Sequence, residues 1–170
     1  MPVHFSSGAV SEITFEGGKA FAVQADIGDE QQVEAMFAWL DKQQEPLTAL
    51  VNNAGILFTQ SRVEALSAER INRVLKTNVT GYFLCCREAV KRMAVSHGGS
   101  GGAIVNVSSA ASRLGAPFEY VDYAASKGAV DTLTTGLALE VAAPTVLLAF
   151  RFTVAVAAMT LVVLVNALVG

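Results

Sequence analysis

The sequence predicts an α/β fold in which helices flank a parallel sheet, and two observations indicate this class. Short apolar runs alternate along the chain with longer stretches whose apolar residues recur at helical spacing. The apolar runs are nearly continuous, as is typical of strands that are buried on both faces of a sheet. With 170 residues, 52% of them hydrophobic and 16% charged, the chain can form a folded core.

The first part of the chain predicts two strands separated by a helix. Lys19–Ala25 is a short apolar run after two glycines and is expected to form a strand. Asp29 is a suitable N-cap for the helix that follows. Leu47–Val51 follows Pro46 and is expected to form a second, buried strand. The apolar residues at helical spacing between them are Val33, Met36, Phe37 and Leu40.

The next part predicts two long helices and a third strand. A helical pattern covers Ser67–Val95, within which Gly81 permits close packing. Ala103–Val107 is the third apolar run and is expected to form a strand. Val121–Val141 again has helical spacing, and Val146–Phe150 could form a fourth strand.

Charge is distributed unevenly and divides the chain into residues 1–142 and an atypical hydrophobic C-terminal segment, 143–170. Of the 27 charged residues, only Arg151 lies after residue 142. Phe152–Val169 has no charge, and its length is at the lower limit of a transmembrane helix. Its Thr and Asn residues and the lack of basic residues beyond Arg151 argue against a membrane span, so we expect a buried or collapsed hydrophobic terminus.

Composition also excludes several classes of protein. The net charge of -3 offers no broad basic face for nucleic acid. The two cysteines, Cys85 and Cys86, are adjacent and cannot form a disulfide framework, and no signal peptide begins the sequence, so we expect a cytoplasmic protein. His4 and His97 are far apart in the sequence, so we expect no metal site.

Small or polar residues follow each predicted strand. They are Asp26, Asn52–Gly55 and Ser108–Ser109. Ligands of open parallel sheets bind beyond the carboxyl ends of the strands, so this edge is the candidate site.

The helix Val121–Val141 carries Tyr123 and Lys127, which lie on one helical face because they are four residues apart. A nearby ammonium favours the phenolate form, and a tyrosine tuned in this way can act as a general acid or base near neutral pH. The pair alone is weak evidence, because such pairs also occur on solvated helix faces.

Four motifs occur in a fixed order on matching elements: Asn52–Gly55, Lys76–Val79, Ser108–Ser109, and Tyr123 with Lys127. Together they resemble the short-chain dehydrogenase/reductase family, in particular its sugar dehydrogenases and 3-oxoacyl-carrier-protein reductases, over about residues 10–142. The resemblance implies a Rossmann-like parallel sheet and an enzyme that interconverts a small-molecule alcohol and a carbonyl. Its cofactor would be NADP or NAD, with NADP slightly favoured, which supplies the hydride chemistry.

The resemblance also implies roles for individual residues. Tyr123 would be the general acid in reduction, and Lys127 would support it and bind the nicotinamide ribose. Ser109 would orient the substrate oxygen, and Asn78 would hold a water that connects Lys127 to solvent. The residues near the adenosine half of the cofactor would be Asn53, Ala54 and Gly55 at the ribose and Asp26 and Ile27 at the adenine.

Some alternatives stay open. Ser108 competes with Ser109 for the catalytic position. Ser109 lies fourteen residues before Tyr123, where the family usually has thirteen, which is consistent with a one-residue insertion around Phe118–Asp122. Asp26 could instead cap the following helix, and Asn53 could cap a strand end.

The sequence departs from the family pattern at both ends. It has no Gly-rich turn of the T-G-x-x-x-G-x-G type, and its first residues resemble the end of the family's second helix. After Val141 it has no Pro-Gly turn and no recognisable substrate loop. Residues 1–142 are therefore expected to be a partial dinucleotide-binding domain that lacks the first βαβ part and the usual C-terminal part. Such a chain is expected to bind dinucleotide poorly and to be unstable or inactive.

The resemblance further implies that Ser67–Val95 and Val121–Val141 form the interface of a homodimer or homotetramer. Two other readings stay open. One is a truncated, non-catalytic relative that works as a binding or subunit-pairing protein. The other is a product anchored to a membrane by residues 152–169.

Overall fold

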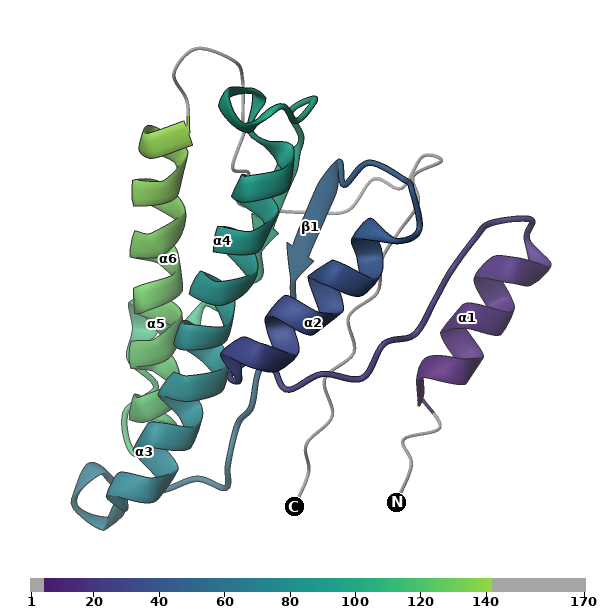
Figure 1. Cartoon of the computed structure of the whole chain (residues 1–170). Helices are drawn as coiled ribbons and strands as arrows, with labels where there is room; N and C mark the ends of the chain where they lie inside the picture. Colours follow the sequence, from purple (N-terminus) through teal and green to yellow (C-terminus); the bar gives the residue numbers. More distant parts are fainter. Residues whose placement is uncertain (1–4, 142–170) are drawn as a thin grey trace.

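The computed structural model describes residues 5–141, in which helices and two strands alternate (Figure 1). The α/β class with a parallel sheet and flanking helices is confirmed. In chain order the elements are α1 (Phe5–Phe15), α2 (Glu30–Asp41), β1 (Ala49–Asn52), the short turn η1 (Val63–Ala65), α3 (Ala68–Leu75), the π-helical turn η2 (Lys76–Thr80), α4 (Gly81–Met93), the short turn η3 (Val95–His97), β2 (Ala103–Asn106), α5 (Ala111–Leu114) and α6 (Val121–Val141).

The sheet of the described residues consists of β1 and β2, which are parallel. They pair in register from Ala49 opposite Ala103 to Asn52 opposite Asn106. Helices α2, α4 and α6 lie side by side over this sheet (Figure 1). The strand residues that point into the core are Leu50, Asn52, Ile104 and Asn106. The two strands predicted at Leu47–Val51 and Ala103–Val107 are thus confirmed, with ends shifted by one or two residues.

The expectation that both faces of the strands are buried is wrong for the described part of the chain. Val51, which points away from α4, is 40% exposed, and Val105 is only half-buried. The reason is that the described helices that contact the strands gather on one face of the sheet. The strands are apolar on both faces, but the described residues cover the face opposite the helices only in part.

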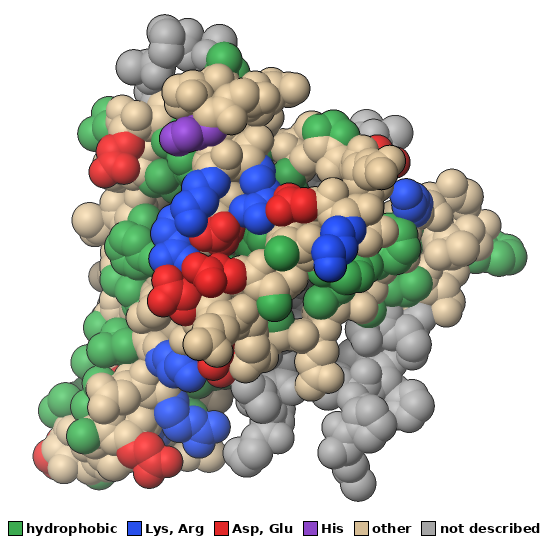
Figure 2. All heavy atoms as spheres, in the orientation of Figure 1, with side chains coloured by type: hydrophobic (Ala, Val, Ile, Leu, Met, Phe, Trp, Pro, Cys, Tyr) green, Lys and Arg blue, Asp and Glu red, His purple; other side chains and the backbone are tan. Residues whose placement is uncertain are grey.

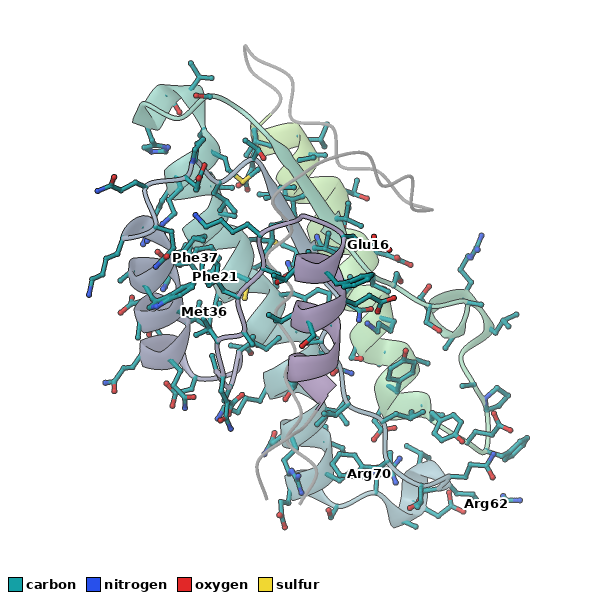
Figure 3. All side chains as sticks on the ribbon, turned by 90° about the vertical axis from the view of Figure 1, so that its right-hand side faces the viewer. Glu16, Phe21, Met36, Phe37, Arg62 and Arg70 are labelled. Carbon is teal, nitrogen blue, oxygen red and sulfur yellow. The ribbon has the colours of Figure 1, made fainter. Side chains whose placement is uncertain are left out.

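The predicted strand at Lys19–Ala25 is also not observed. The segment has no regular secondary structure, although Phe21, Val23 and Ala25 alternate inward as they would in a strand. A strand needs a neighbouring strand to accept its backbone hydrogen bonds, and β1 pairs only with β2 in the described sheet. The segment instead packs on α2, where the Phe21 and Trp39 rings meet edge-on at 5.3 Å and Phe21 lies near Met36 and Phe37 (Figure 3).

The helices predicted from apolar spacing are confirmed, and polar caps fix where two of them begin. The Asp29 carboxylate accepts the backbone N–H of Gln32 at 3.0 Å at the start of α2. The Ser67 hydroxyl accepts the N–H of Arg70 at 3.2 Å at the start of α3. Each cap satisfies an N–H group that has no partner within its own helix.

A π-helical turn, η2, interrupts the long helix between α3 and α4. The N–H of Gly81 donates to the carbonyl of Lys76, five residues earlier. A Cβ atom on Gly81 would lie 2.7 Å from Cγ1 and Cδ1 of Ile27, so only glycine allows this approach. The expectation that Gly81 permits close packing is confirmed.

A network of ion pairs joins α2 to α4 across the surface in Figure 2. The largely buried Glu88 accepts hydrogen bonds from Arg87, Lys91 and Arg92 at 2.8–3.1 Å, and Arg92 also binds Asp41 of α2. Burial would raise the pKa of Glu88, but the hydrogen bonds from Lys91, Arg92 and Arg87 outweigh it and lower the pKa to about 2. The carboxylate therefore stays charged at ordinary pH and orients Arg92, whose ion pair with Asp41 joins the two helices.

Within residues 5–141, no helix is long and apolar enough to cross a membrane, and no cluster of metal-ligating side chains is found. The predicted fourth strand, Val146–Phe150, and the apolar segment Phe152–Val169 lie outside the described residues. The division between residues 1–142 and 143–170 stays a prediction.

The contact between Gly81 and Ile27 leads to a test of the packing. Gly81→Ala should lower the free energy of unfolding by about 1–2 kcal/mol, because the methyl group meets Ile27 and outweighs the gain in helix propensity. Gly136→Ala in α6 is the matched control, since no atom lies within 4 Å of its added Cβ, and it should be neutral or slightly stabilising. Urea unfolding of both variants checks this, and equal effects would contradict it.

Candidate active site

The carboxyl ends of β1 and β2 meet at one edge of the sheet, and the long helices bring side chains to the same edge. Gly55, in the loop after β1, lies beside groups from two helices. A Cβ at this position would lie 3.4 Å from Oδ1 of Asn78 and 3.8 Å from Nζ of Lys127. Of its predicted neighbours, Asn53 is exposed and Ala54 is half-buried against the core. The structure therefore brings Gly55, Asn78 and Lys127 together, as expected.

Asn78 lies in η2, is fully buried and uses its side-chain amide to connect three elements. Its Oδ1 accepts the N–H of Ile56 at 2.8 Å, and its Nδ2 donates to the carbonyl of Ile56 at 3.0 Å. Nδ2 also donates to the hydroxyl of Ser126 in α6 at 3.1 Å. Both amide protons are thus used by protein groups. The role of water holder in a proton relay stays a prediction for Asn78.

Lys127 is buried at 3% exposure, and its ammonium is held near the end of β2. Nζ donates to the carbonyl of Val107 at 2.7 Å and to the hydroxyl of Tyr82 at 3.4 Å. It also lies 5.7 Å from the centre of the Tyr123 ring. Burial lowers the pKa of Lys127 to about 8, and the charge of Asp131 opposes this shift only in part. An amine with this pKa can exchange protons near neutral pH.

Tyr123 stands in the first turn of α6, and an ion pair fixes the start of that helix. Asp122, its neighbour in the chain, has a nearly buried side chain and binds Arg70 of α3 at 2.8 Å. Arg70 also donates to the carbonyl of Thr59 in the loop after β1 at 2.7 Å. Burial would raise the pKa of Asp122, but hydrogen bonds, first of all from Arg70, lower it. The ion pair therefore orients the turn that carries Tyr123.

The two serines after β2 have different partners. The Ser108 hydroxyl donates to the carbonyl of Lys127 at 3.4 Å, which ties it to the α6 backbone. The Ser109 hydroxyl accepts the N–H of Ala111 at 3.2 Å, and this bond does not use its proton. The Ser109 hydroxyl can therefore still donate a hydrogen bond, which favours Ser109 over Ser108 as the group that binds a substrate oxygen.

Asp26 and Ile27, the residues expected at the adenine, behave differently from one another. The Asp26 carboxylate accepts the N–H of Gly28 at 2.9 Å and binds Lys76 of η2 at 3.4 Å. Ile27 is buried against Gly81, so its side chain belongs to the core. Of these two residues, Asp26 is the one with a polar side chain that a ligand could contact.

Sequence reasoning missed several residues of this site. Lys127 is contacted by Tyr82, and Asn78 by Ser126. The turn that carries Tyr123 is positioned by the ion pair of Arg70 with Asp122. Spacing gave a signal for two of them, since Tyr82 follows Asn78 by one helical turn and Ser126 precedes Lys127. Nothing in the sequence pairs Arg70 with a residue 52 positions away.

Comparisons with known proteins place the chain in one family. The family model described as short chain dehydrogenase matches residues 6–158. The sequence is 74% identical over 141 residues to the uncharacterized oxidoreductase YgfF of Escherichia coli (strain K12), covering 83% of this chain and 57% of that protein. It is 40% identical over 126 residues to a 3beta-hydroxysteroid dehydrogenase of Mediterraneibacter gnavus, covering 74% of this chain and 44% of that protein.

Among solved structures, ElxO with NADP bound matches with a TM-score of 0.63 and 36% identity. The match covers 69% of this chain and 46% of that one. The chain thus spans about half the length of the curated relatives it matches.

The lowered pKa of Lys127 predicts how stability depends on pH. Its pKa is about 8 in the folded chain and 10.5 in the unfolded one. The contribution of this shift to the unfolding free energy is therefore fully present above pH 10.5 and is lost as the pH falls through 8. Between pH 7.5 and 10.5, the unfolding free energy of the wild type should rise by about 1–3 kcal/mol relative to Lys127→Met. Lys42→Met is the control at an exposed lysine and should show no such trend. A constant difference between wild type and Lys127→Met would contradict the burial of the charge.

Proposed function

Because the chain belongs to the short-chain dehydrogenase family, we propose that it is an NAD(P)-dependent oxidoreductase that interconverts a small-molecule alcohol and a carbonyl by hydride transfer. One observation carries the proposal. The Lys127 ammonium lies 5.7 Å from the Tyr123 ring at the carboxyl edge of the sheet, on the helix that Asn78 and Ser108 contact.

The described residues would contact parts of both halves of a nicotinamide dinucleotide. Gly55 has no side chain where a Cβ would approach both Asn78 and Lys127, so a ligand can approach the backbone there. Lys127 and Asn53–Gly55 would hold the ribose groups, and Asp26 would contact the adenine. The sequence contains no Gly-rich turn of the family type for the pyrophosphate. When bound, the nicotinamide supplies or accepts the hydride.

The chain's own residues would handle the proton and the substrate oxygen. In reduction, the Tyr123 hydroxyl gives its proton to the carbonyl oxygen of the substrate, and the Ser109 hydroxyl donates a hydrogen bond to the same oxygen. The Lys127 ammonium stabilises the phenolate that Tyr123 becomes. The alcohol product forms when the hydride and this proton have both been transferred, and oxidation runs through the same steps in reverse.

The finer expectations belong to the proposal. NADP is slightly favoured over NAD, and the likeness to a solved structure that contains NADP supports this choice. Oligomer formation would use the outer surfaces of the long helices, where Leu75, Phe83 and Leu139 are 39%, 51% and 76% exposed. The cytoplasm is proposed as the compartment, because Cys85 and Cys86 are both unpaired and buried.

A second candidate function is a relative that pairs with other subunits and does not catalyse. The same exposed apolar side chains on the long helices favour it. Dinucleotide binding distinguishes the two candidate functions, because a subunit-pairing protein does not need to bind a dinucleotide.

Titration of the purified chain with NADPH and NADH, followed by nicotinamide fluorescence, tests the proposal. The proposal requires saturable binding, even if its affinity is low, and Lys127→Ala should reduce that affinity at least tenfold, equivalent to about 1.4 kcal/mol. Lys91→Ala is the control, because Lys91 pairs with Glu88 on the surface of α4. Tyr123→Phe should keep the binding and lower turnover of a reducible carbonyl substrate by roughly 100-fold or more.

Two results would contradict the proposal. If the folded wild type binds neither dinucleotide, the second candidate function is favoured. If Tyr123→Phe turns over substrate at the wild-type rate, Tyr123 is not the general acid.

A further inference from the structure

Tyr82 is a fully buried tyrosine in the first turn of α4, and no motif of the sequence singles it out. It follows Asn78 by four residues, so the two side chains lie on the same face of the long helix that α3, η2 and α4 form together. Asn78 reaches Ser126 of α6, and Tyr82 reaches the next residue, Lys127. The long helix therefore contacts α6 through two consecutive polar groups.

The direction of each hydrogen bond follows from the protons available. The single hydroxyl proton of Tyr82 is donated to the carbonyl of Val107 at 3.3 Å. The phenol oxygen therefore presents a lone pair to Lys127, whose Nζ donates to it at 3.4 Å. Nζ also donates to the same Val107 carbonyl at 2.7 Å, which closes a cluster of three polar groups.

Tyr82 is suited to keep this arrangement over a wide range of pH. Burial raises the pKa of its phenol above the ordinary value, and Tyr123, Cys85 and Cys86 add to the effect. The hydroxyl thus keeps its proton and remains a donor to Val107. The titratable groups that act on Lys127 are Tyr82 from α4 and Tyr123 and Asp131 from its own helix.

The two tyrosine rings also flank the ammonium. Nζ of Lys127 lies 5.1 Å from the centre of the Tyr82 ring and 5.7 Å from the centre of the Tyr123 ring. Gly55 lies on a further side, where an added Cβ would be 3.8 Å from Nζ. Two of the three ammonium protons thus have protein acceptors, and the glycine loop borders the space that remains.

We propose that Tyr82 is a positioning residue for Lys127, which holds the ammonium against the Val107 carbonyl so that its remaining proton is presented to a hydroxyl group of the cofactor. The inference rests on the proposed function for the identity of that ligand. The contact of Tyr82 with Lys127 does not depend on that ligand, because it is present in the ligand-free chain.

The titration of Lys127 in the ligand-free chain tests this role. The wild type, Tyr82→Phe and Tyr120→Phe are labelled with [ε-13C]lysine, and the Lys127 signal is identified by its loss in Lys127→Arg. Removing the phenol oxygen takes an acceptor from the buried ammonium, so the pKa of Lys127 should fall by roughly 0.5–1 unit in Tyr82→Phe. Tyr120→Phe also removes one phenol oxygen, but that oxygen does not bond to Lys127, so the pKa should not change. An unchanged pKa in Tyr82→Phe overturns the proposal.

Dinucleotide titration then separates this inference from the proposed function. Tyr82→Phe should bind NADPH several-fold more weakly than the wild type, whereas Tyr120→Phe should bind it equally well. If the wild type binds no dinucleotide, the proposed function fails, while the Lys127 titration still decides the contact. If the wild type binds and Tyr82→Phe binds equally well, the positioning role fails.

A measurement on the wild type covers the case in which Tyr82→Phe does not fold. The two groups lie close enough for nuclear Overhauser effects between the Lys127 side chain and the Tyr82 ring protons. Their presence supports the contact, and their absence in the folded wild type overturns it.

Discussion

The buried amide of Asn78 is the interaction on which the rest of the candidate site depends. A fully buried amide must find partners, and a lost hydrogen bond in such a place costs about 1–3 kcal/mol. Its partners are both backbone groups of Ile56 and the hydroxyl of Ser126. One side chain therefore fixes the loop that follows β1 against the helix that carries Tyr123 and Lys127. Asn78 lies in the π-helical turn η2. Gly81, the residue directly after this turn, packs closely on Ile27.

The long helix and α6 are matched along their length by polar pairs. Arg70 binds Asp122, Asn78 binds Ser126, and Tyr82 binds Lys127. Deeper in the core, Asn52 donates to Asn106 at 2.8 Å across the two strands, and Asn106 donates to Thr134 of α6 at 3.0 Å. Buried polar pairs of this kind favour one relative position of the elements over others, because a shift would leave several groups without partners. The candidate site is thus organised by the described residues themselves.

The sequence was sufficient to predict what depends on local pattern. Apolar spacing and the cap Asp29 located the helices, and the residues that follow the strands indicated the edge at which Gly55 lies near Asn78 and Lys127. The strand predicted at Lys19–Ala25 was wrong because a strand depends on a partner, and apolar pattern does not show whether a partner is present. For the same reason the sequence could not show that one face of the sheet is only partly covered.

Side-chain contacts over long separations were also beyond reach. The contact of Tyr82 with Lys127 spans 45 residues, and it depends on a π-helical turn that apolar spacing does not reveal. The burial of the Ile27 side chain against Gly81 was also not visible in the sequence, and the place of Ile27 at the adenine stays a prediction. In the short-chain dehydrogenase family the protein supplies position and protons to the cofactor's chemistry, so these contacts are where differences in activity would arise.

Amide hydrogen exchange at Ile56 tests the central claim most directly. Ile56 lies in a loop, and the acceptor of its N–H is the side chain of Asn78. The account predicts that this amide is protected in the folded wild type and that Asn78→Ala lowers the protection at least tenfold. The amide of Ala103, which donates to the carbonyl of Thr48, should keep its protection in both proteins. Unprotected exchange of Ile56 in the folded wild type, or protection that survives Asn78→Ala, would contradict the account.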